Sequence, residues 1–475
     1  MITSGANRCL TIKTKKEMRK ILFVVAAVAS MVFTACIKED LNVNENAPVG
    51  TIEFTASFDA ETKTTLNNGK TEWIKGDEIS INGVKFKANA SGASVKFTNA
   101  ETPQGEFKAP FTAVYPYSNT LPAVQTVSNG TFADESVVSV AYIEGKDSKD
   151  LTFKHVSSVI KFQVANDVAS DIVFESSQNL AGKLNVNTDA TYTVSSGGSK
   201  TITVKSATGI FRKNETYYVS VLPTPGTTKV DFKVKVEGVT IKSGQVSFAR
   251  NRIVDAKSFE VKYLYLKPNT NWKSSNARFA LYAWGCPGGD AWANMKEVDG
   301  NVYRAVVPEG TTGYKYVRLN PGTTENNWNE GVKWNETNDL NDLGENKMYT
   351  IAEGAWDKGS GSYSTYYAIY LVPGVWSADN ARFTVYAWNN SGNTWINMAK
   401  AKSNNNYYFA LLPDGYNDFK FVRMNPNTTT NNWNDGVKWN DLAYNLARTN
   451  DGTNLFSISG WDNKGSWSKY TPVYN

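Results

Sequence analysis

The side chains in this sequence that could act on another molecule are mainly aromatic. Segments 278–284 and 382–388 repeat the order Arg-Phe-x-x-Tyr-Ala-Trp at a spacing of 104 residues. Because side chains alternate between the two faces of a strand, Phe279 is expected in a core, while Tyr282 and Trp284 share the opposite face. Flat aromatic faces with amide and charged groups beside them fit the C–H faces of sugar rings. The repeat therefore predicts a binding surface that occurs twice.

Groups that catalysis would need are scarce in the chain. It contains one histidine, His155, which falls in a predicted strand and is expected to be structural. The sequence shows no nucleophile elbow, phosphate-binding glycine loop, histidine-rich metal motif or calcium loop. Carboxylates are numerous, so counting them does not exclude a glycosidase pair. Tandem small domains carry binding sites more often than catalytic sites, and we predict a protein that is not an enzyme and uses no cofactor or metal.

The candidate ligand-binding residues are aromatic and polar side chains that occur in both copies of the repeat. They are Tyr282, Trp284, Trp292, Asn294, Trp328, Lys333 and Trp334 in the first copy, with Tyr386, Trp388, Trp395, Asn397, Trp433, Lys438 and Trp439 in the second. A tryptophan can instead fill the core of a small sandwich, and both placements stay open for Trp328, Trp334 and their counterparts. For Trp356 and Trp461 we predict the core. Arg278 and Arg318 are expected to be surface charges or members of structural pairs.

The elements that position these residues are predicted to be strands. A chain of 475 residues is too long for one core, and long helical periodicity is hard to find after the first 35 residues. Short alternating segments between turn residues indicate an all-β, multi-domain chain of β-sandwiches. We predict a signal peptide at 1–35 with the true start at Met18, a lipidated cysteine and tether at 36–50, lobes at 51–148 and 149–262, and tandem modules at 263–366 and 367–475.

The first residues have the features of a lipoprotein leader. An apolar run at 21–33 follows Arg19 and Lys20 and is too short to span a bilayer, as is typical of a signal peptide. The segment that ends in Cys36 resembles a bacterial lipobox, which implies cleavage before Cys36 and lipidation of that residue. The next residues, 37–40, are similar to a surface-export signal of Gram-negative lipoproteins, although they also fit a solvated tether.

The charge of the chain excludes nucleic acid as its partner. The formal net charge is +5, and the first 35 residues account for all of it, which leaves 44 basic and 44 acidic residues in the remainder. A near-neutral chain lacks the basic surface that binding to a phosphate backbone requires.

The region 50–260 carries a resemblance in three segments, which are 73–79, 113–116 and 151–156. They resemble the fimbrillin-like families of lipid-anchored surface proteins, which implies two stacked transthyretin-like β-sandwich lobes. In polymerising members, an Arg-specific protease removes an N-terminal strand so that subunits can exchange donor strands. After the tether cysteine the first arginine is Arg212, deep in the second lobe, so we do not expect polymerisation by this route.

The C-terminal region, residues 263–475, carries a second resemblance. Its residues are Tyr282 to Trp284, Ala291 to Met295, Tyr316 to Asn320 and Trp334 to Leu340. They resemble starch-binding carbohydrate-binding modules, which implies that Tyr282, Trp284 and Trp292 cradle α-1,4-linked glucose. After Trp439 the second copy lacks the threonine and the later Asp-Leu pair, so its site is expected to be weaker or tuned differently.

These features lead to one main prediction and one alternative. The main prediction is a lipid-anchored outer-membrane protein, exposed on the cell surface, that binds polysaccharide, starch-like α-glucan first, without catalysis. The alternative is a fimbrial tip or adhesin subunit that binds host glycoprotein or other subunits, since exposed aromatic residues serve protein interfaces equally well. A glycan-active hydrolase is a weaker third candidate.

Overall fold

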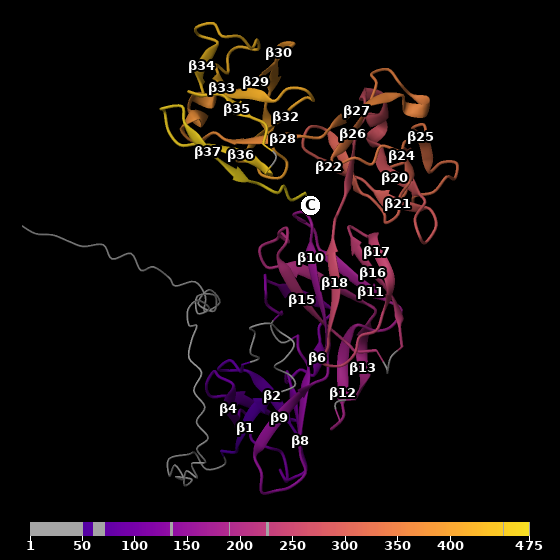
Figure 1. Cartoon of the computed structure of the whole chain (residues 1–475), viewed down its shortest axis with the longest axis vertical. Helices are drawn as coiled ribbons and strands as arrows, with labels where there is room; N and C mark the ends of the chain where they lie inside the picture. Colours follow the sequence, from indigo (N-terminus) through magenta and orange to yellow (C-terminus); the bar gives the residue numbers. More distant parts are fainter. Residues whose placement is uncertain are drawn as a thin grey trace, which may run out of the picture. The chain divides into compact units, whose positions relative to one another are not determined.

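The computed structural model describes residues 51–59, 72–133, 136–189, 191–224, 228–449 and 451–474. The predicted signal peptide, the lipidated Cys36 and the tether lie outside these residues. The regular secondary structure of the described chain is almost entirely strand (Figure 1), which confirms the all-β prediction. Its helical elements are single turns or short 3-10 segments, namely α1 (Thr270–Lys273), η3 (Ser274–Asn276), η4 (Asp357–Gly359) and η5 (Gly374–Asn380). Among the described residues, no helix has the length and apolarity needed to cross a membrane.

The first lobe is a closed β-barrel rather than an open sandwich. Its strands pair in the order β1 (Glu53–Phe58), β4 (Ser94–Asn99), β3 (Val84–Ala88), β2 (Glu78–Ile81), β5 (Phe111–Tyr115), β8 (Ser139–Ile143) and β9 (Asp150–His155). The barrel closes because β1 pairs with β4 on one side and with β9 on the other, which leaves no free edge in this sheet. Strict alternation in β1 turns Phe58 inward, where its ring stacks on buried Trp73 with the ring centroids 4.3 Å apart.

The second lobe contains three sheets. Their strand orders are β15 (Thr216–Val221), β10 (Ser158–Val164), β18 (Ile253–Phe259); β17 (Val239–Val246), β16 (Val230–Val236), β11 (Ile172–Ser176), β14 (Thr201–Ser206), β7 (Val124–Val127); and β13 (Tyr192–Ser199), β12 (Ala181–Val186), β6 (Thr120–Leu121). Phe162 on β10 contacts Phe174 on β11 at 5.3 Å between ring centroids, so the sheet that contains β10 and the five-stranded sheet share one core. Strands β6 and β7 precede residue 148, so sheets of the second lobe take in strands from both sides of that point.

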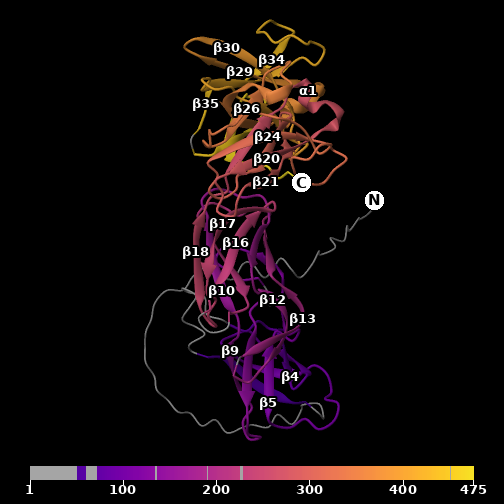
Figure 2. The ribbon, with the colours of Figure 1, turned by 90° about the vertical axis from the view of Figure 1, so that its right-hand side faces the viewer.

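The two C-terminal copies, here called the first module and the second module, have the same strand order. Figure 2 labels some strands of each, among them β20, β21 and β24 of the first module and β29, β30 and β34 of the second. The first module has the sheets β22 (Lys296–Val298), β23 (Val302–Val306), β19 (Tyr263–Lys267), β26 (Lys347–Ile351), β27 (Gly361–Thr365) and β21 (Ala291–Asn294), β20 (Arg278–Trp284), β24 (Gly313–Leu319), β25 (Lys333–Glu336). The second module has β31 (Ala399–Lys400), β32 (Tyr408–Leu411), β28 (Ala368–Val372), β36 (Thr453–Ile458), β37 (Gly465–Lys469) and β30 (Gly392–Asn397), β29 (Arg382–Asn389), β33 (Asp418–Met424), β34 (Lys438–Asp441), with β35 (Leu446–Ala447) paired to β33.

Strand β20 presents a core face and an open face, as the alternation predicts. Phe279, Leu281 and Ala283 point inward and are at most 2% exposed. Tyr282 and Trp284 lie on the other face and are only half-buried. The core side therefore fixes the strand, and the aromatic side is partly open to solvent.

His155 at the end of β9 is expected to make the stability of the first lobe depend on pH. Its Nδ1 lies 2.6 Å from the Ser139 hydroxyl, and burial together with the positive charge of Arg250 lowers the pKa of His155 to about 4. The unfolded chain has the ordinary histidine pKa of about 6.5, so it binds the proton more readily than the folded chain does between these values. The stabilisation from neutral His155 is complete above pH 6.5 and is lost as the pH falls toward 4.

We expect this loss to reach about 2–3 kcal/mol of unfolding free energy. Urea unfolding of the first lobe at pH 7, 5.5 and 4.5 measures it. In His155→Gln, which cannot titrate, the unfolding free energy is expected to change less over the same interval. Equal slopes for the variant and the wild type would show that His155 does not cause the pH dependence.

Candidate functional site

In the first module, four aromatic rings gather on the open face of the sheet that contains β20. Strand pairing places Tyr282 directly opposite Trp292 on β21, and the ring centroids of the two residues are 4.9 Å apart. Trp328, from the loop between β24 and β25, lies 4.8 Å from Tyr282 and 5.1 Å from Trp292. Trp284 flanks Tyr282 at 6.3 Å. These four rings are called the first aromatic cluster.

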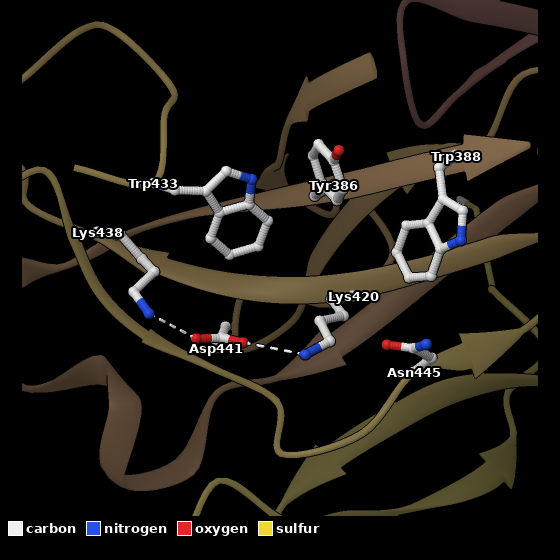
Figure 3. Close-up of a pocket in the computed structure, with 7 residues that line it drawn as sticks. All are labelled: Tyr386, Trp388, Lys420, Trp433, Lys438, Asp441 and Asn445. Atoms are coloured by element: carbon white, nitrogen blue, oxygen red, sulfur yellow. Dashed lines mark hydrogen bonds and ion pairs between the residues drawn. The ribbon is translucent and has the colours of Figure 1, made fainter. Parts of the chain in front are cut away.

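The second module builds the same arrangement from its own residues, Tyr386, Trp388, Trp395 and Trp433, called the second aromatic cluster. Tyr386 lies 4.8 Å from Trp395, 5.0 Å from Trp433 and 5.6 Å from Trp388. Three of these rings border an open hollow of about 430 Å³. The other lining residues are polar, and Figure 3 shows them along the opposite side from the rings: Lys420, Lys438, Asp441 and Asn445.

A group of lysines around one carboxylate lies beside each cluster. In the second module, Asp441 accepts from Lys438 at 2.7 Å and from Lys420 at 3.1 Å. Burial raises the pKa of Asp441, but the hydrogen bonds from Lys438 and Lys420 outweigh it, so the pKa is lowered overall and the carboxylate stays charged. The ammonium of Lys438 also lies 5.7 Å from the Trp433 ring centroid, within range of a cation–π contact. Charged hydrogen-bonding groups thus stand directly beside the aromatic rings.

The first module has the corresponding group around Glu336. Its carboxylate lies 3.5 Å from the Lys333 ammonium and 3.8 Å from that of Lys315, and it also accepts from Lys358. Burial raises the pKa of Glu336, but the lysines lower it overall. Lys333 is 5.8 Å from the Trp328 ring centroid, as Lys438 is from Trp433. Of the predicted polar residues, Lys333 and Lys438 therefore lie beside the clusters.

The loop that carries Trp328 is held in place by Arg278, and this role was not recognised in the sequence. The Arg278 guanidinium donates to the Asn320 carbonyl at 3.1 Å, to the Thr323 hydroxyl at 3.0 Å and to Asn326. Arg382 does the same for the loop of Trp433, donating to the Asn425 carbonyl at 3.1 Å and to the Thr428 hydroxyl at 3.0 Å. The presence of an arginine at the same place in both copies was the available signal.

The predicted amides Asn294 and Asn397 belong to this loop support. Asn294 accepts from Asn326 at 2.9 Å, and Asn397 accepts from Asn431 at 3.0 Å. Both asparagines are exposed, so the second lone pair of each side-chain oxygen and the amide donors still face solvent.

We expect Arg382→Gln to weaken ligand binding by the second module about tenfold, because a loop that is no longer held must be ordered at the cost of binding energy. Hydrogen–deuterium exchange should rise in residues 425–434 while exchange in the β29–β33 ladder stays unchanged. Arg278→Gln is the matched control, since it should change only residues 320–329. Unchanged exchange in both loops would contradict the proposed support role.

Trp334 and Trp439 do not join the clusters. The Trp334 ring lies over the guanidinium of Arg318 at 4.5 Å, and Trp356 lies over the same group at 5.0 Å. Arg318 is 4% exposed and donates to the Trp272 carbonyl at 2.8 Å, so this stack is a structural element, as expected for this arginine. In the second module, Trp439 and Trp461 stack on Arg423 in the same way.

The prediction of a core position for Trp356 and Trp461 was wrong. Trp356 is 45% exposed and Trp461 is 53% exposed. The core position is taken by another residue in each module, Trp272 or Trp376, both of which are completely buried. The exposed tryptophans therefore cover the arginine stacks from outside.

The two clusters differ in what surrounds them. In the first cluster, the Tyr282 hydroxyl donates to Asp290, and this hydrogen bond raises the pKa of Tyr282. The Trp284 indole lies over Gly313 on β24, where only glycine fits because a Cβ would clash with the indole. In the second, Asp418 stands opposite Trp388 in the strand register. Within the described residues, no group of three or more His, Cys, Asp or Glu side chains is placed to hold a metal ion. The arrangement is suited to binding a ligand against aromatic faces.

Comparison with known proteins finds similarity to a fimbrium subunit and to cell-adhesion and fimbrial assembly proteins. No family model matches the chain. It is 26% identical over 286 residues to Fim1C, a candidate fimbrium subunit of Bacteroides uniformis, and the match spans 52% of this chain and 90% of that protein. Among solved structures, a candidate cell adhesion protein from Bacteroides uniformis covers 44% of this chain and 94% of its own length, at 18% identity and a TM-score of 0.27. A fimbrial assembly protein from Parabacteroides distasonis covers 54% of this chain and 99% of its own length, at 11% identity and a TM-score of 0.22.

Proposed function

We propose that this protein is a non-catalytic cell-surface protein of the fimbrial and cell-adhesion type that presents two ligand-binding modules. The similarity to a fimbrium subunit over 90% of that subunit's length supports this class. It favours the adhesin alternative of the sequence analysis over polysaccharide capture as the main role.

The observation that carries ligand binding is the repetition of one aromatic cluster in both modules. Trp328 is 41% exposed and Trp433 is 42% exposed, although each could have been buried in a core. Both copies keep the four rings, the two lysines, the carboxylate and the arginine that holds the loop. Large aromatic side chains exposed to water are unfavourable for the folded chain. Their retention in both copies of a tandem duplication is best accounted for by binding.

The experiment is a binding screen of the chain from residue 37 onward against immobilised mucin-type glycoproteins, before and after periodate treatment. Periodate destroys sugar rings and leaves the polypeptide, so loss of binding after treatment identifies a glycan ligand. Binding that survives periodate would move the proposal to a protein surface or to other subunits. A parallel assay for reducing ends on a polysaccharide panel tests the proposed absence of catalysis, and release of reducing ends would refute it.

Capture of a neutral polysaccharide, with starch-like α-glucan first, is the second candidate. The inclined rings of Tyr386, Trp388 and Trp433 around an open hollow favour it, because they can follow a curved row of sugars. Affinity electrophoresis in gels that contain starch, xylan or mucin separates the two proposals. Retardation by starch alone would favour polysaccharide capture, and retardation by mucin alone would favour the adhesin.

We further propose that Cys36 carries lipid and anchors the chain in the outer membrane with its modules exposed. The cysteine follows an apolar leader run and small residues. In cells fed an alkyne-labelled fatty acid, the wild-type protein should take up label and Cys36→Ser should take up none. Equal labelling of both would refute lipidation at this residue, and resistance of the modules to protease added to intact cells would refute surface exposure.

A further inference from the structure

The charged ends of the two clusters differ at two positions: the first module has Lys358 on Glu336 where the second has Asn463, and the residues beside Lys315 and Lys420 also differ. In each module a leucine pairs with the second residue of β24 or β33, Leu340 with Tyr314 and Leu446 with Phe419. The residue before that leucine is Asp339 in the first module and Asn445 in the second. The Asp339 carboxylate lies 3.0 Å from the Lys315 ammonium. Asn445 instead lines the hollow together with Lys420. The second module thus has one negative charge fewer beside the same lysine.

Hydrogen-bond donors exceed acceptors at this end of the hollow. Lys438 donates to one oxygen of Asp441 at 2.7 Å, while Lys420 donates to the other at 3.1 Å and to the Leu442 carbonyl at 3.0 Å. Each ammonium has three N–H groups, so half of these donors have no hydrogen-bond partner among the described residues, while both Asp441 oxygens already accept. The two lysines and one carboxylate also leave a net positive charge on the lining residues.

These donors lie where a ring held by the aromatic cluster would place its substituents. Figure 3 shows the rings of Trp433, Tyr386 and Trp388 along one side and the two lysines along the other. A neutral sugar hydroxyl could use the lone pairs that Asp441 has left, but it carries no charge to match the two ammonium groups. A carboxylate only accepts, so it matches a surface of free ammonium donors, and such charge-assisted hydrogen bonds are the stronger kind.

We infer that the second-module hollow binds an acidic sugar, whose ring lies on the aromatic cluster and whose carboxylate accepts from Lys420 and Lys438. The first module should not share this preference, because Asp339 would oppose a ligand carboxylate there. This inference rests on the proposed function, since it names the ligand class of the same site. The carboxylate could belong to a sialic acid or to a uronic acid, and the probes separate these sources.

The test is calorimetric titration of the chain from residue 37 onward with two pairs of probes, 3′-sialyllactose against lactose and trigalacturonate against maltotriose. At least one acidic probe should bind about tenfold tighter than its neutral partner at low salt, and the difference should shrink as salt is raised. Preference within the first pair identifies a sialic acid, and preference within the second a uronic acid.

Asn445→Asp is the matched variant, because it has the same shape and restores the residue of the first module. It should remove most of the preference for the acidic probe, and the reciprocal Asp339→Asn should create a second site for it. Equal affinity for acidic and neutral probes, with Asn445→Asp unchanged and Trp433→Ala defective, would overturn this inference and leave the aromatic site intact. If none of the four probes binds, the inference is overturned, and mucin binding that survives periodate would overturn the glycan site as well.

Discussion

Loss of Trp328 and Trp433 together is expected to abolish retention on the ligand that the binding screen identifies. Each ring touches two other members of its cluster, at centroid distances between 4.8 and 5.1 Å. A buried aromatic contact of this kind contributes about 2 kcal/mol or more to binding, which is about 30-fold in affinity at one site. Two linked sites on one polymer can gain a further factor of roughly 10²–10⁴, and this gain is lost when either site fails.

The single and double variants are therefore expected to differ in how strongly they are retained. Trp328→Ala or Trp433→Ala alone should leave weak binding through the remaining module, and the double variant should leave none. Retention in an affinity gel measures this, with the midpoint of thermal unfolding recorded for each variant. The matched control is Trp356→Ala with Trp461→Ala, because these tryptophans are at least as exposed but lie on the arginine stacks. A control pair that loses retention while the cluster pair keeps it would place the binding surface at the stacks instead.

Replacement of Arg423 by methionine is expected to unfold the second module at a much lower temperature. Arg423 is 4% exposed and donates to the carbonyls of Trp376 at 2.8 Å and Ala378 at 2.7 Å. Methionine fills much of the same volume but donates nothing, so these carbonyls lose their partner. Each buried carbonyl left unsatisfied costs about 1–3 kcal/mol, which gives about 3–5 kcal/mol when the lost stacking on Trp439 is included.

For a module of this size, such a loss should lower its unfolding midpoint by on the order of 10–20 °C. Differential scanning calorimetry of the full chain measures this, with the transitions of the other parts as internal reference. Lys464→Met is the control in the same module, because its ion pair with Asp462 is exposed and should contribute little. A midpoint for Arg423→Met within the range of Lys464→Met would show that the buried arginine is not needed for folding.

The open face of β20 could be predicted because it depends on local alternation. Once Phe279 and Leu281 are assigned to a core, Tyr282 and Trp284 must point the other way, and the duplication at 382–388 confirms the same pattern in a second strand. The all-β class also follows from short-range patterns of this kind. The binding role of these residues remains a proposal.

The placement of the remaining tryptophans could not be predicted, because it depends on contacts between distant parts of the chain. Trp328 joins the first cluster since its loop is held by Arg278, a residue 42 to 48 positions away from its partners there. Trp356 is excluded from the core because Trp272 occupies it. No local pattern shows which of the two tryptophans the core will contain.

Trp334 shows most clearly that the position of a tryptophan depends on strand pairing. It follows Lys333 directly, so alternation puts the two on opposite faces of the strand but does not show which of them faces the cluster. In the structure the pairing of β24 with β25 shifts by one residue between Arg318 and Leu319, and Trp334 is the extra residue at this β-bulge. The bulge lets Lys333 stay beside Trp328 while Trp334 turns to the Arg318 stack. The sequence by itself determined the all-β class, the duplication and the open aromatic face, whereas the tertiary structure decided which tryptophans belong to the site, since a one-residue shift in strand pairing moves a side chain from one face of a sheet to the other.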